Sequence, residues 1–578
     1  LERLLQANVG HLTVRVRDAG SVYAIILEDP IEKGFEAIDW FCDLPFILTR
    51  TKKPPEGWTG TVVDYDAERK RRSEYFEAWR QLSAEAKRPG ATVDQFPELA
   101  AVLALEPRDD WDILAQINQM QAITAYTQVL TAWHECKACF DRVLCLLLGL
   151  FATTPNEIDG TLEKWKTLSG KESIKTTTVT PVQVLNPGMG KGINRLKADG
   201  AQRLGNPDSF WLVEFLKFWG MRRAGIPRIV QPPQPGSGRG PRDRKTYVLR
   251  PVNITLDTND QVYLRFNRAM WSSTATKMDL LATLRYTDAF LAQWQAGDLV
   301  DVRWGEEPGD HVCGMSAAFY KDLGSAPAVL NLAELALPQW MTIETSEQLQ
   351  IYRDLLKEHR RIVDSLQERN SDEYRLLQHY RDFISGRDVG AFYAFAGGYA
   401  SLTMSRMERR QWAPRYTTTN LEVLIMAHDK ELAPILQCPG FRNIAGAIRR
   451  STVIPQYFKS RGEKGPYTVR YGLGAELLRQ ATYPEQFIQA LSTFVHDYNR
   501  ETGQVQERYK DNLRVRRSQI TTEDVQQVVE LIDIYGSKTV GNMLVAFGYA
   551  REPRDPDADK QEPQQPEPAA ETESGVEH

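Results

Sequence analysis

The stretch Thr521–Ile534, TTEDVQQVVELIDI, carries the signature of a helix with a defined start. Threonines and acidic residues precede the helical pattern of Val525–Ile534, and this order is typical of a capped helix N-terminus. Apolar residues recur at helical spacing in nearly every segment from about residue 338 to residue 550. The sequence therefore predicts a helical bundle in the C-terminal part of the chain.

The part of the chain before residue 338 mixes strand patterns with helix patterns. Residues 11–16 and 22–27 alternate as β-strands do, whereas Ala67–Ala86 has helical spacing. Helical spacing also extends from Trp111 to Phe151, which predicts one or two long helices. We therefore predict an α+β fold. Its expected parts are an α/β N-terminal region at 1–110, a mixed α/β domain at 111–337, a helical bundle at 338–550 and a disordered acidic tail at 551–578.

Two segments of the expected mixed domain carry more specific signals. Ser209–Trp219 is a largely apolar helix pattern that should be buried. Thr246–Leu256 and Gln261–Asn267 alternate on either side of Asp257-Thr258-Asn259-Asp260, a pattern typical of a β-hairpin. The mixed domain is therefore expected to contain a buried helix followed by a hairpin.

Charge is distributed unevenly along the chain. The formal net charge is -5, but residues 551–578 hold nine acidic residues against three basic ones, which leaves the rest of the chain near +1. Residues 183–250 hold thirteen lysines and arginines and only four acidic residues. Such a local basic field is the electrostatic footprint expected of phosphate binding.

A glycine-lysine segment, NPGMGKGINRLKADG at 186–200, lies inside this basic field. Glycines at 188, 190 and 192 let main-chain amides approach an anion closely. Four side chains of the segment can contact phosphates or base edges: Lys191, Asn194, Arg195 and Lys197. The segment is interpreted as a nucleic-acid contact, and a flexible surface turn with solvated charge is the alternative.

Two nucleotide-binding motifs are excluded for this segment. A P-loop has Ser or Thr directly after its Gly-Lys pair, whereas Gly192 and Ile193 follow Lys191 here. The dinucleotide fingerprint requires glycine or alanine where Ile193 stands. Simple ATPase and dehydrogenase interpretations are therefore disfavoured, and no cofactor is expected.

A second basic segment, at 442–479, contains eight lysines and arginines interrupted by two glutamates. Aromatic residues interleave with these cations at positions 457, 458, 467 and 471. Aromatic faces that stack on bases, beside cations that hold phosphates, are the usual equipment for binding single-stranded nucleic acid. Four residues are expected to hold a single strand: Arg449, Arg450, Arg461 and Arg470. A solvated helix face with core aromatics is the alternative, and further cations at 508–517 extend the positive strip.

Candidate metal and catalytic motifs are incomplete. Cys136 and Cys139, close to His134, form half of a common zinc site, but no second closely spaced cysteine pair follows, so they are interpreted as core residues. The pairs His428-Asp429 and His496-Asp497 could serve a metal-dependent nuclease if His359 and His379 joined them. No Gly-x-Ser-x-Gly elbow occurs. The sequence predicts neither a catalytic residue nor a metal ligand.

The expected compartment is the cytoplasm. Six cysteines in 578 residues and the lack of a signal-peptide pattern in the opening residues suggest a reducing environment. The most apolar stretch, Val143–Phe151, is nine residues long, whereas about twenty are needed to span a membrane. No membrane association is expected.

The order of these parts resembles the large subunit of type I CRISPR Cascade effector complexes, especially those of subtypes I-A and I-B. The resemblance rests on Asn186-Pro187, Gly190-Lys191-Gly192, Asn194-Arg195 and Lys197-Ala198, followed by FWLVEFLKFWG at Phe210–Gly220. These residues cover under a tenth of the chain. The α/β front and the helical rear extend the similarity at the level of architecture only.

The resemblance implies a non-catalytic subunit that recognises a protospacer-adjacent motif in duplex DNA and stabilises the R-loop formed by guide RNA and target DNA. The implied partners are CRISPR guide RNA, target double-stranded DNA, the Cascade backbone subunits and a recruited helicase-nuclease or other effector. Lys191 and its neighbours, assisted by Arg222 and Arg223, are then expected to contact the guide RNA or motif-proximal DNA. The C-terminal bundle resembles the small subunit of such complexes. The alternatives are a metal-dependent, HD-type nuclease and a general RNA-binding or scaffold protein outside CRISPR defence.

Overall fold

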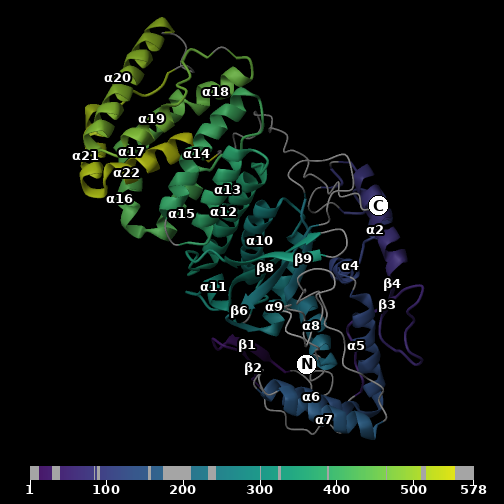
Figure 1. The fold of residues 1–578 in the computed structure, drawn as a ribbon. Helices are drawn as coiled ribbons and strands as arrows, with labels where there is room; N and C mark the ends of the chain where they lie inside the picture. Colours follow the sequence, from purple (N-terminus) through teal and green to yellow (C-terminus); the bar gives the residue numbers. More distant parts are fainter. Residues whose placement is uncertain are drawn as a thin grey trace, which may run out of the picture.

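The computed structural model describes residues 12–28, 39–83, 85–87, 92–120, 122–153, 158–172, 210–231, 243–299, 301–322, 327–386, 389–463, 465–509 and 516–553. The glycine-lysine segment at 186–200 and residues 554–578 of the predicted acidic tail lie outside these ranges. The described elements form an elongated molecule with a four-stranded sheet near the middle and a helical bundle at one end (Figure 1).

The N-terminal strands pair with a strand from much later in the chain. β1 (Val14–Asp18) is antiparallel to β2 (Tyr23–Leu27), and its other edge pairs with β7 (Asn253–Thr255). The two alternating runs at the start of the sequence are therefore strands, as predicted. Because the β1–β7 hydrogen bonds join them to residues 253–255, the N-terminal region and the mixed domain are built together.

A layer of helices surrounds a short parallel pair of strands, β3 (Phe46–Leu48) and β4 (Val62–Asp64). The helices of this layer are α2 (Tyr65–Gln81), α3 (Glu98–Leu103), α4 (Trp111–Gln119), α5 (Ile123–Glu135), η1 (Cys136–Cys139), α6 (Phe140–Ala152), α7 (Ile158–Lys171) and α8 (Trp211–Ala224). Trp133 of α5 stacks on Phe215 of α8 with 4.3 Å between ring centroids. The helices predicted at 67–86 and 209–219 are present as α2 and α8, although α2 ends at Gln81. The one or two long helices predicted at 111–151 are instead three shorter helices, α4, α5 and α6, with η1 between the last two. Helix α8 buries its aromatic residues, as predicted.

The central sheet is antiparallel, with the order β5-β6-β8-β9. Its strands are β5 (Gly225–Ile229), β6 (Arg244–Pro251), β8 (Val312–Asp322) and β9 (Pro327–Ala336). The helices that follow or precede these strands are α9 (Leu256–Ala269), α10 (Ala275–Gln295) and α11 (Pro308–His311). The long helix α10 is buried over much of its surface, which places it in the core beside the sheet.

The predicted β-hairpin at 246–267 is wrong in its second half. Strands β6 and β7 account for the first run, but helix α9 begins at Leu256. Thr255 starts this helix, because its hydroxyl oxygen accepts a hydrogen bond from the backbone N–H of Thr258 at 3.3 Å. The apolar residues at 262, 263 and 266 are buried on one helix face. Helical spacing therefore explains the pattern that resembled strand alternation.

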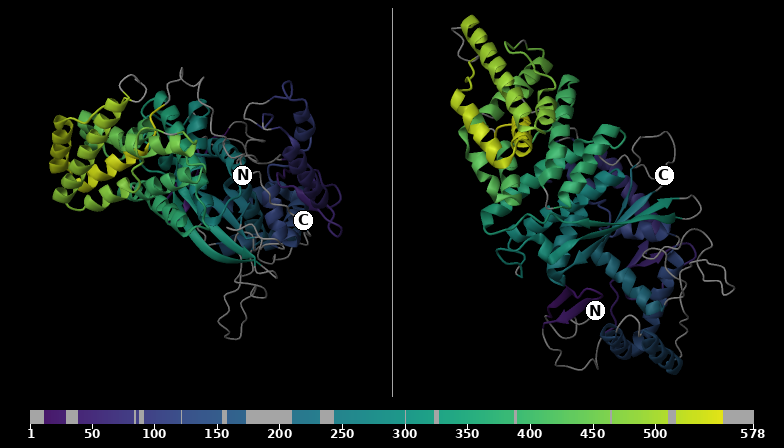
Figure 2. Two further views of the ribbon diagram at one scale, coloured as in Figure 1. Left: turned by 90° about the horizontal axis from the view of Figure 1, so that it is seen from above. Right: turned by 60° about the vertical axis from the view of Figure 1, so that its left-hand side comes forward.

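The C-terminal part is helical, as predicted, and Figure 2 shows it projecting beyond the sheet in two further views. Its helices are α12 (Ser346–Ser365), α13 (Ser371–Ile384), α14 (Val389–Glu408), α15 (Thr418–His428), η3 (Lys430–Leu432), α16 (Ala433–Gln437), α17 (Pro439–Ser451), α18 (Val453–Ser460), α19 (Leu473–Gln480), α20 (Pro484–Arg508), α21 (Thr522–Tyr535) and α22 (Ser537–Tyr549). One apolar core continues across residue 338, from the sheet into these helices. None of the described helices combines the length and apolar character that crossing a membrane requires.

Close packing inside the bundle depends on small residues at one helix crossing. Helices α17 and α22 meet at Gly548, where a Cβ atom would lie 2.5 Å from the Cγ2 atom of Ile448. Such a distance is too short for a side chain, so glycine permits the close approach of the two helices. Phe441 and Phe547 pack edge to face beside this crossing, with 5.5 Å between ring centroids.

The start of α21 supplies a test of the capping signal. The Thr521 hydroxyl accepts from the Asp524 N–H at 3.2 Å, and the Asp524 carboxylate accepts from the Thr521 N–H at 2.8 Å. We expect Thr521→Ala to lower the free energy of unfolding by about 1 kcal/mol, measured by urea denaturation. The control Thr493→Ala, at an exposed position inside α20, should change it by less than about 0.5 kcal/mol. Equal losses for both variants would contradict the capping role.

Candidate nucleic-acid interface

Two of the predicted contact residues in the front basic field are held by carboxylates. The Arg222 guanidinium lies 3.1 Å from the Asp110 carboxylate and also contacts Asp43. Arg223 forms an ion pair with Asp260. Because both side chains are about three-quarters buried, these ion pairs connect α8 to neighbouring segments. Contact of Arg222 and Arg223 with nucleic acid stays a prediction, and so do the contacts of Lys191, Asn194, Arg195 and Lys197, which lie outside the described residues.

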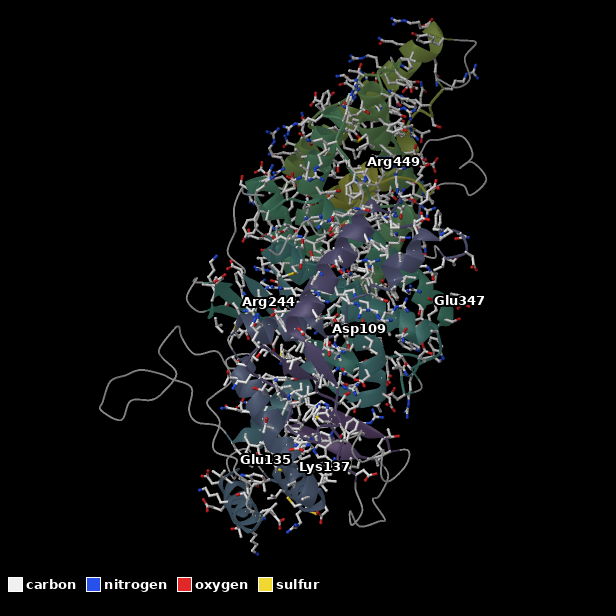
Figure 3. All side chains as sticks on the ribbon, turned by 90° about the vertical axis from the view of Figure 1, so that its right-hand side faces the viewer. Asp109, Glu135, Lys137, Arg244, Glu347 and Arg449 are labelled. Carbon is white, nitrogen blue, oxygen red and sulfur yellow. The ribbon has the colours of Figure 1, made fainter. Side chains whose placement is uncertain are left out.

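Other cations of the front basic field are structural. Arg228 is buried, donates to the Met270 carbonyl at 2.9 Å, and pairs with Asp112 at 2.9 Å. Lys245 is also buried and lies 2.7 Å from the Asp279 carboxylate. Figure 3 shows Arg244 of the same field beside the middle of the molecule. The charge count over 183–250 therefore overstates the positive charge that this region presents to solvent.

Arg449, predicted to hold a single strand, is also an internal residue. It lies on α17 and is only 6% exposed (Figure 3). One guanidinium nitrogen donates to the Phe547 carbonyl at 2.8 Å, and another pairs with Glu552. Arg449 thus joins α17 to the end of α22. Its neighbour Arg450 donates from Nε to the Tyr498 hydroxyl at 2.9 Å and stays partly exposed.

The end of α18 presents cations and aromatic rings together. Lys459 Nζ donates to the Tyr471 hydroxyl at 3.0 Å and lies 5.3 Å from the centre of the same ring. The Tyr471 hydroxyl donates in turn to Oε1 of the buried Gln456 at 2.7 Å. Because this chain of hydrogen bonds fixes the hydroxyl, the Tyr471 ring is held in place while 47% of the residue stays exposed. The hydrogen bond to Tyr471 also raises the pKa of Lys459, which keeps the amine charged.

A second pair lies beside the first and joins Tyr457 of α18 to Arg461, the residue that follows the helix. Arg461 donates to the Tyr457 hydroxyl at 2.7 Å, and its guanidinium carbon lies 5.5 Å from the centre of that ring. Phe458, which lies between Tyr457 and Lys459 in the sequence, is 40% exposed and meets Tyr457 edge to face. We call Tyr457, Phe458, Lys459, Arg461 and Tyr471 the cation-aromatic surface.

Arg470 borders the cation-aromatic surface and belongs to the segment that carries Tyr471. Its guanidinium lies 5.6 Å from the Phe494 ring centre and 3.7 Å from the Asp497 carboxylate. Its backbone N–H donates to the carbonyl of Ser451 at 2.8 Å, which ties the segment to the end of α17. Of the predicted rear residues, Arg461 is exposed and belongs to the cation-aromatic surface, whereas Arg470 borders it with three-quarters of its side chain buried.

A buried arginine, Arg517, contacts the segment that leads to Tyr471. Arg517 lies between two tyrosines, with its guanidinium carbon 3.8 Å from the ring centre of Tyr467 and 4.0 Å from that of Tyr498. It also pairs with Glu501 at 2.7 Å, and the Glu501 carboxylate accepts from the Thr468 N–H at 2.8 Å. Arg517 was expected to extend the exposed positive strip. That expectation is wrong, because only 7% of the residue is exposed.

The cation-aromatic surface combines two capacities. Exposed rings can stack on unpaired bases, and the adjacent cations can bind phosphates. Sequence reasoning selected the arginines and noted the aromatic positions, but it missed Gln456 and the pairing of Lys459 with Tyr471. The signal for that pairing is weak, because twelve residues separate the two partners along the chain.

The histidines proposed for a nuclease site occupy different environments. His359 is buried, and its Nδ1 lies 2.7 Å from the Tyr380 hydroxyl. His428 packs against the Trp340 ring, with its Nδ1 2.9 Å from the Leu424 carbonyl, whereas His496 is exposed on α20. In the described part of the chain, no three His, Cys, Asp or Glu side chains are arranged to hold a metal ion.

Cys136 and Cys139 are core residues in the described fold, in agreement with their interpretation from the sequence. Both are at most 1% exposed and belong to the apolar core around α5, α6 and α8. The Cys136 thiol donates to the Ala132 carbonyl at 3.1 Å. Burial raises the pKa of this thiol, so the reactive thiolate form is disfavoured.

Comparison of the chain with protein-family models, with curated proteins and with solved structures finds no match. A functional interpretation of this protein accordingly depends on its own residues. Among those described, the cation-aromatic surface is the arrangement with the clearest chemical capacity.

The buried imidazole of His359 predicts a pH dependence of stability. Burial, and secondarily the charge of His428, lower its pKa to about 3, whereas an unfolded histidine titrates near 6.5. The unfolded chain therefore binds a proton first, and stability is lost as pH falls from about 6.5 toward 3. On this account the free energy of unfolding should fall by about 1.4 kcal/mol between about pH 7.5 and pH 5.5.

We expect His359→Gln to remove this component, measured by urea unfolding at both pH values. The control His496→Gln, at an exposed histidine, should keep the pH dependence of the unsubstituted protein. An unchanged pH dependence in His359→Gln would contradict the buried neutral state of His359.

Proposed function

We propose that this protein is a non-catalytic, nucleic-acid-binding subunit of a CRISPR RNA-guided DNA surveillance complex, and that its cation-aromatic surface holds a single strand. The observation that carries the binding role is the pairing of Lys459 with the exposed ring of Tyr471, next to exposed Phe458 and Arg461. Exposed rings beside cations suit unpaired bases joined by phosphates. The place in a CRISPR complex is supported by the sequence resemblance.

Recognition of the protospacer-adjacent motif belongs to the glycine-lysine segment in this proposal. Its glycines give close backbone approach, and Lys191, Asn194, Arg195 and Lys197 supply phosphate and base contacts. The rear surface then stabilises the target strand or the displaced strand of the R-loop. The partners are guide RNA, target duplex DNA, the Cascade backbone subunits and a separately recruited helicase-nuclease or other effector, all in the cytoplasm. Cleavage is assigned to that effector, so the chain itself is not an enzyme.

Strand binding should respond to the cations of the cation-aromatic surface. Lys459→Gln and Arg461→Gln should each weaken binding of a fluorescent single-stranded oligonucleotide and reduce the slope of log Kd against log salt by about 0.7 for each phosphate that the chain no longer neutralises. The measurement is fluorescence anisotropy over a salt series. Lys538→Gln, at an exposed position on α22, is the matched control and should keep the original slope. Equal slopes for all three variants would refute the assigned surface.

Loss of an exposed ring should act differently from loss of a charge. Phe458→Ala should cost roughly 1–3 kcal/mol of strand binding, about 5- to 150-fold in Kd, with an unchanged salt slope, because stacking releases no counterions. Because Phe458 is 40% exposed, the variant should keep its fold, which circular dichroism can check. An unchanged Kd in Phe458→Ala would contradict the proposal that a base stacks on the Phe458 ring.

The CRISPR role has its own test in the assembled complex. Binding of a target duplex by purified guide complex should depend on this chain and on the flanking motif, and it should fall when Lys191 or Arg195 is replaced by glutamine. The readout is a gel-shift titration with matched and mutated motifs. Motif-dependent binding without the chain would overturn this role. Strand binding that needs neither guide nor motif would instead favour an RNA-binding or scaffold protein outside CRISPR defence.

A further inference from the structure

The described chain ends beside the rear basic segment. The Arg551 N–H donates to the Tyr416 carbonyl at 2.8 Å, and the Arg551 carbonyl accepts from the Thr418 N–H at 2.9 Å. These two bonds form a short β-bridge with Thr417. The next residue, Glu552, pairs with the buried Arg449 while 73% of its own side chain stays exposed. The first acidic residue of the C-terminal segment is therefore already bound by a cation of α17.

Positive charge is concentrated around this ion pair. Burial and the neighbouring cations Arg449 and Arg551 lower the pKa of Arg415 to about 10. Arg551 lies 3.7 Å from the Glu358 carboxylate. Arg551 and Arg449 each pair with one carboxylate, Glu358 and Glu552, and both cations act on Arg415, so the environment favours further negative charge.

The C-terminal anchor is adjacent to the cation-aromatic surface. Arg449, which holds Glu552, is followed on α17 by Arg450 and then Ser451, whose carbonyl accepts from the Arg470 N–H at 2.8 Å. Arg449 and Ser451 are two residues apart, about 3 Å along the helix axis. Arg415 lies within electrostatic reach of Arg449 and Arg551 on one side and of Tyr457, a member of the cation-aromatic surface, on the other. Chain leaving residue 552 starts within reach of the exposed cations.

The composition of residues 554–578 complements those cations. This segment holds eight acidic residues and two basic ones. A linker of twenty-five residues with random-coil statistics spans an r.m.s. distance of about 25–30 Å, enough to cross a bundle face. The cations of this region are Lys459, Arg461 and Arg470, and the carboxylates of Glu408, Glu463 and Asp497 balance part of their charge.

We infer that the acidic C-terminal segment, 552–578, docks on the cation-aromatic surface of its own chain and competes there with single-stranded nucleic acid. Glu552 supplies the anchor, and the following carboxylates take the places of phosphates. The docking contact is inferred from the charges of the segment and the surface and from the position of Glu552. Only the identity of the competing ligand, a single strand, rests on the proposed function. Strand binding must then displace the segment, which raises the Kd of every strand by the same factor. At a given strand concentration, weakly bound strands therefore lose more of their occupancy than strands held by additional contacts.

The expected size of the competition follows from the tether. A short flexible tether gives an effective concentration of about 1 mM, so a docking contact with a Kd of about 0.1 mM weakens strand binding about ten-fold. The effect should be largest near 0.1 M salt and vanish near 1 M, because the Debye length falls from about 10 Å to about 3 Å.

Docking can be measured without nucleic acid. A carbodiimide joins lysine amines to carboxylates in contact, and mass spectrometry of the treated full-length protein should find Lys459 linked to acidic residues of 555–577. These links should disappear in 1 M salt, and control Lys538 of α22 should carry fewer of them. Absence of any link from Lys459 to the segment would overturn the docking.

Competition is measured with a full-length variant in which the eight acidic residues of 554–578 are replaced by the corresponding amides. Its Kd for a single-stranded oligonucleotide should be about ten-fold lower than that of the unsubstituted chain in about 0.1 M salt, and Glu552→Gln should give a smaller change in the same direction. Equal Kd values, with binding still dependent on Lys459, overturn the competition and leave the proposed function intact. Links from Lys459 to the segment, without strand binding by either protein, support the docking and overturn the proposed function.

Discussion

The Arg517 guanidinium, enclosed by the rings of Tyr467 and Tyr498, is the interaction on which the rear surface depends. A buried cation is costly unless it is paired, and Arg517 is paired with Glu501 at 2.7 Å. The same carboxylate accepts the Thr468 N–H, so the charge pair also fixes the backbone that leads to Tyr471. This support is internal and does not involve the exposed cations Lys459 and Arg461.

The two basic segments use their charge in different ways. In the front segment, Arg228 and Lys245 lie buried against carboxylates and join strands to helices. In the rear segment, Lys459 and Arg461 contact aromatic hydroxyls and rings and keep access to solvent. Similar charge counts in the sequence therefore correspond to a buried structural network in one region and an exposed cation-aromatic surface in the other.

Periodicity predicted most of the helices and the first two strands, because one buried face imposes a repeat that is visible in sequence. It failed for α9, where buried positions at 262, 263 and 266 fit both a helix face and a strand pattern over so short a run. The candidate site was predictable only in outline. Arg449 and Arg461 look alike in sequence, yet the first is buried against the Phe547 carbonyl, 98 residues away, and the second is exposed. Whether such an arginine is buried or exposed depends on contacts with residues far away in the sequence, and the local sequence pattern carries no information about these contacts.

The geometry of the rear surface favours a single strand over a duplex. In a duplex the bases are stacked on each other, so a protein ring meets phosphates, sugars and base edges, and cations alone supply most of the affinity. Rings held with nearly half of their surface exposed, as Tyr471 and Phe458 are, gain energy when unpaired bases stack on them. The hydrogen bond from Tyr471 to the buried Gln456 fixes one ring before any ligand arrives, which reduces the entropy cost of binding. Under the proposed function, a strand that is already separated, as in an R-loop, is therefore the ligand that suits this preorganised surface.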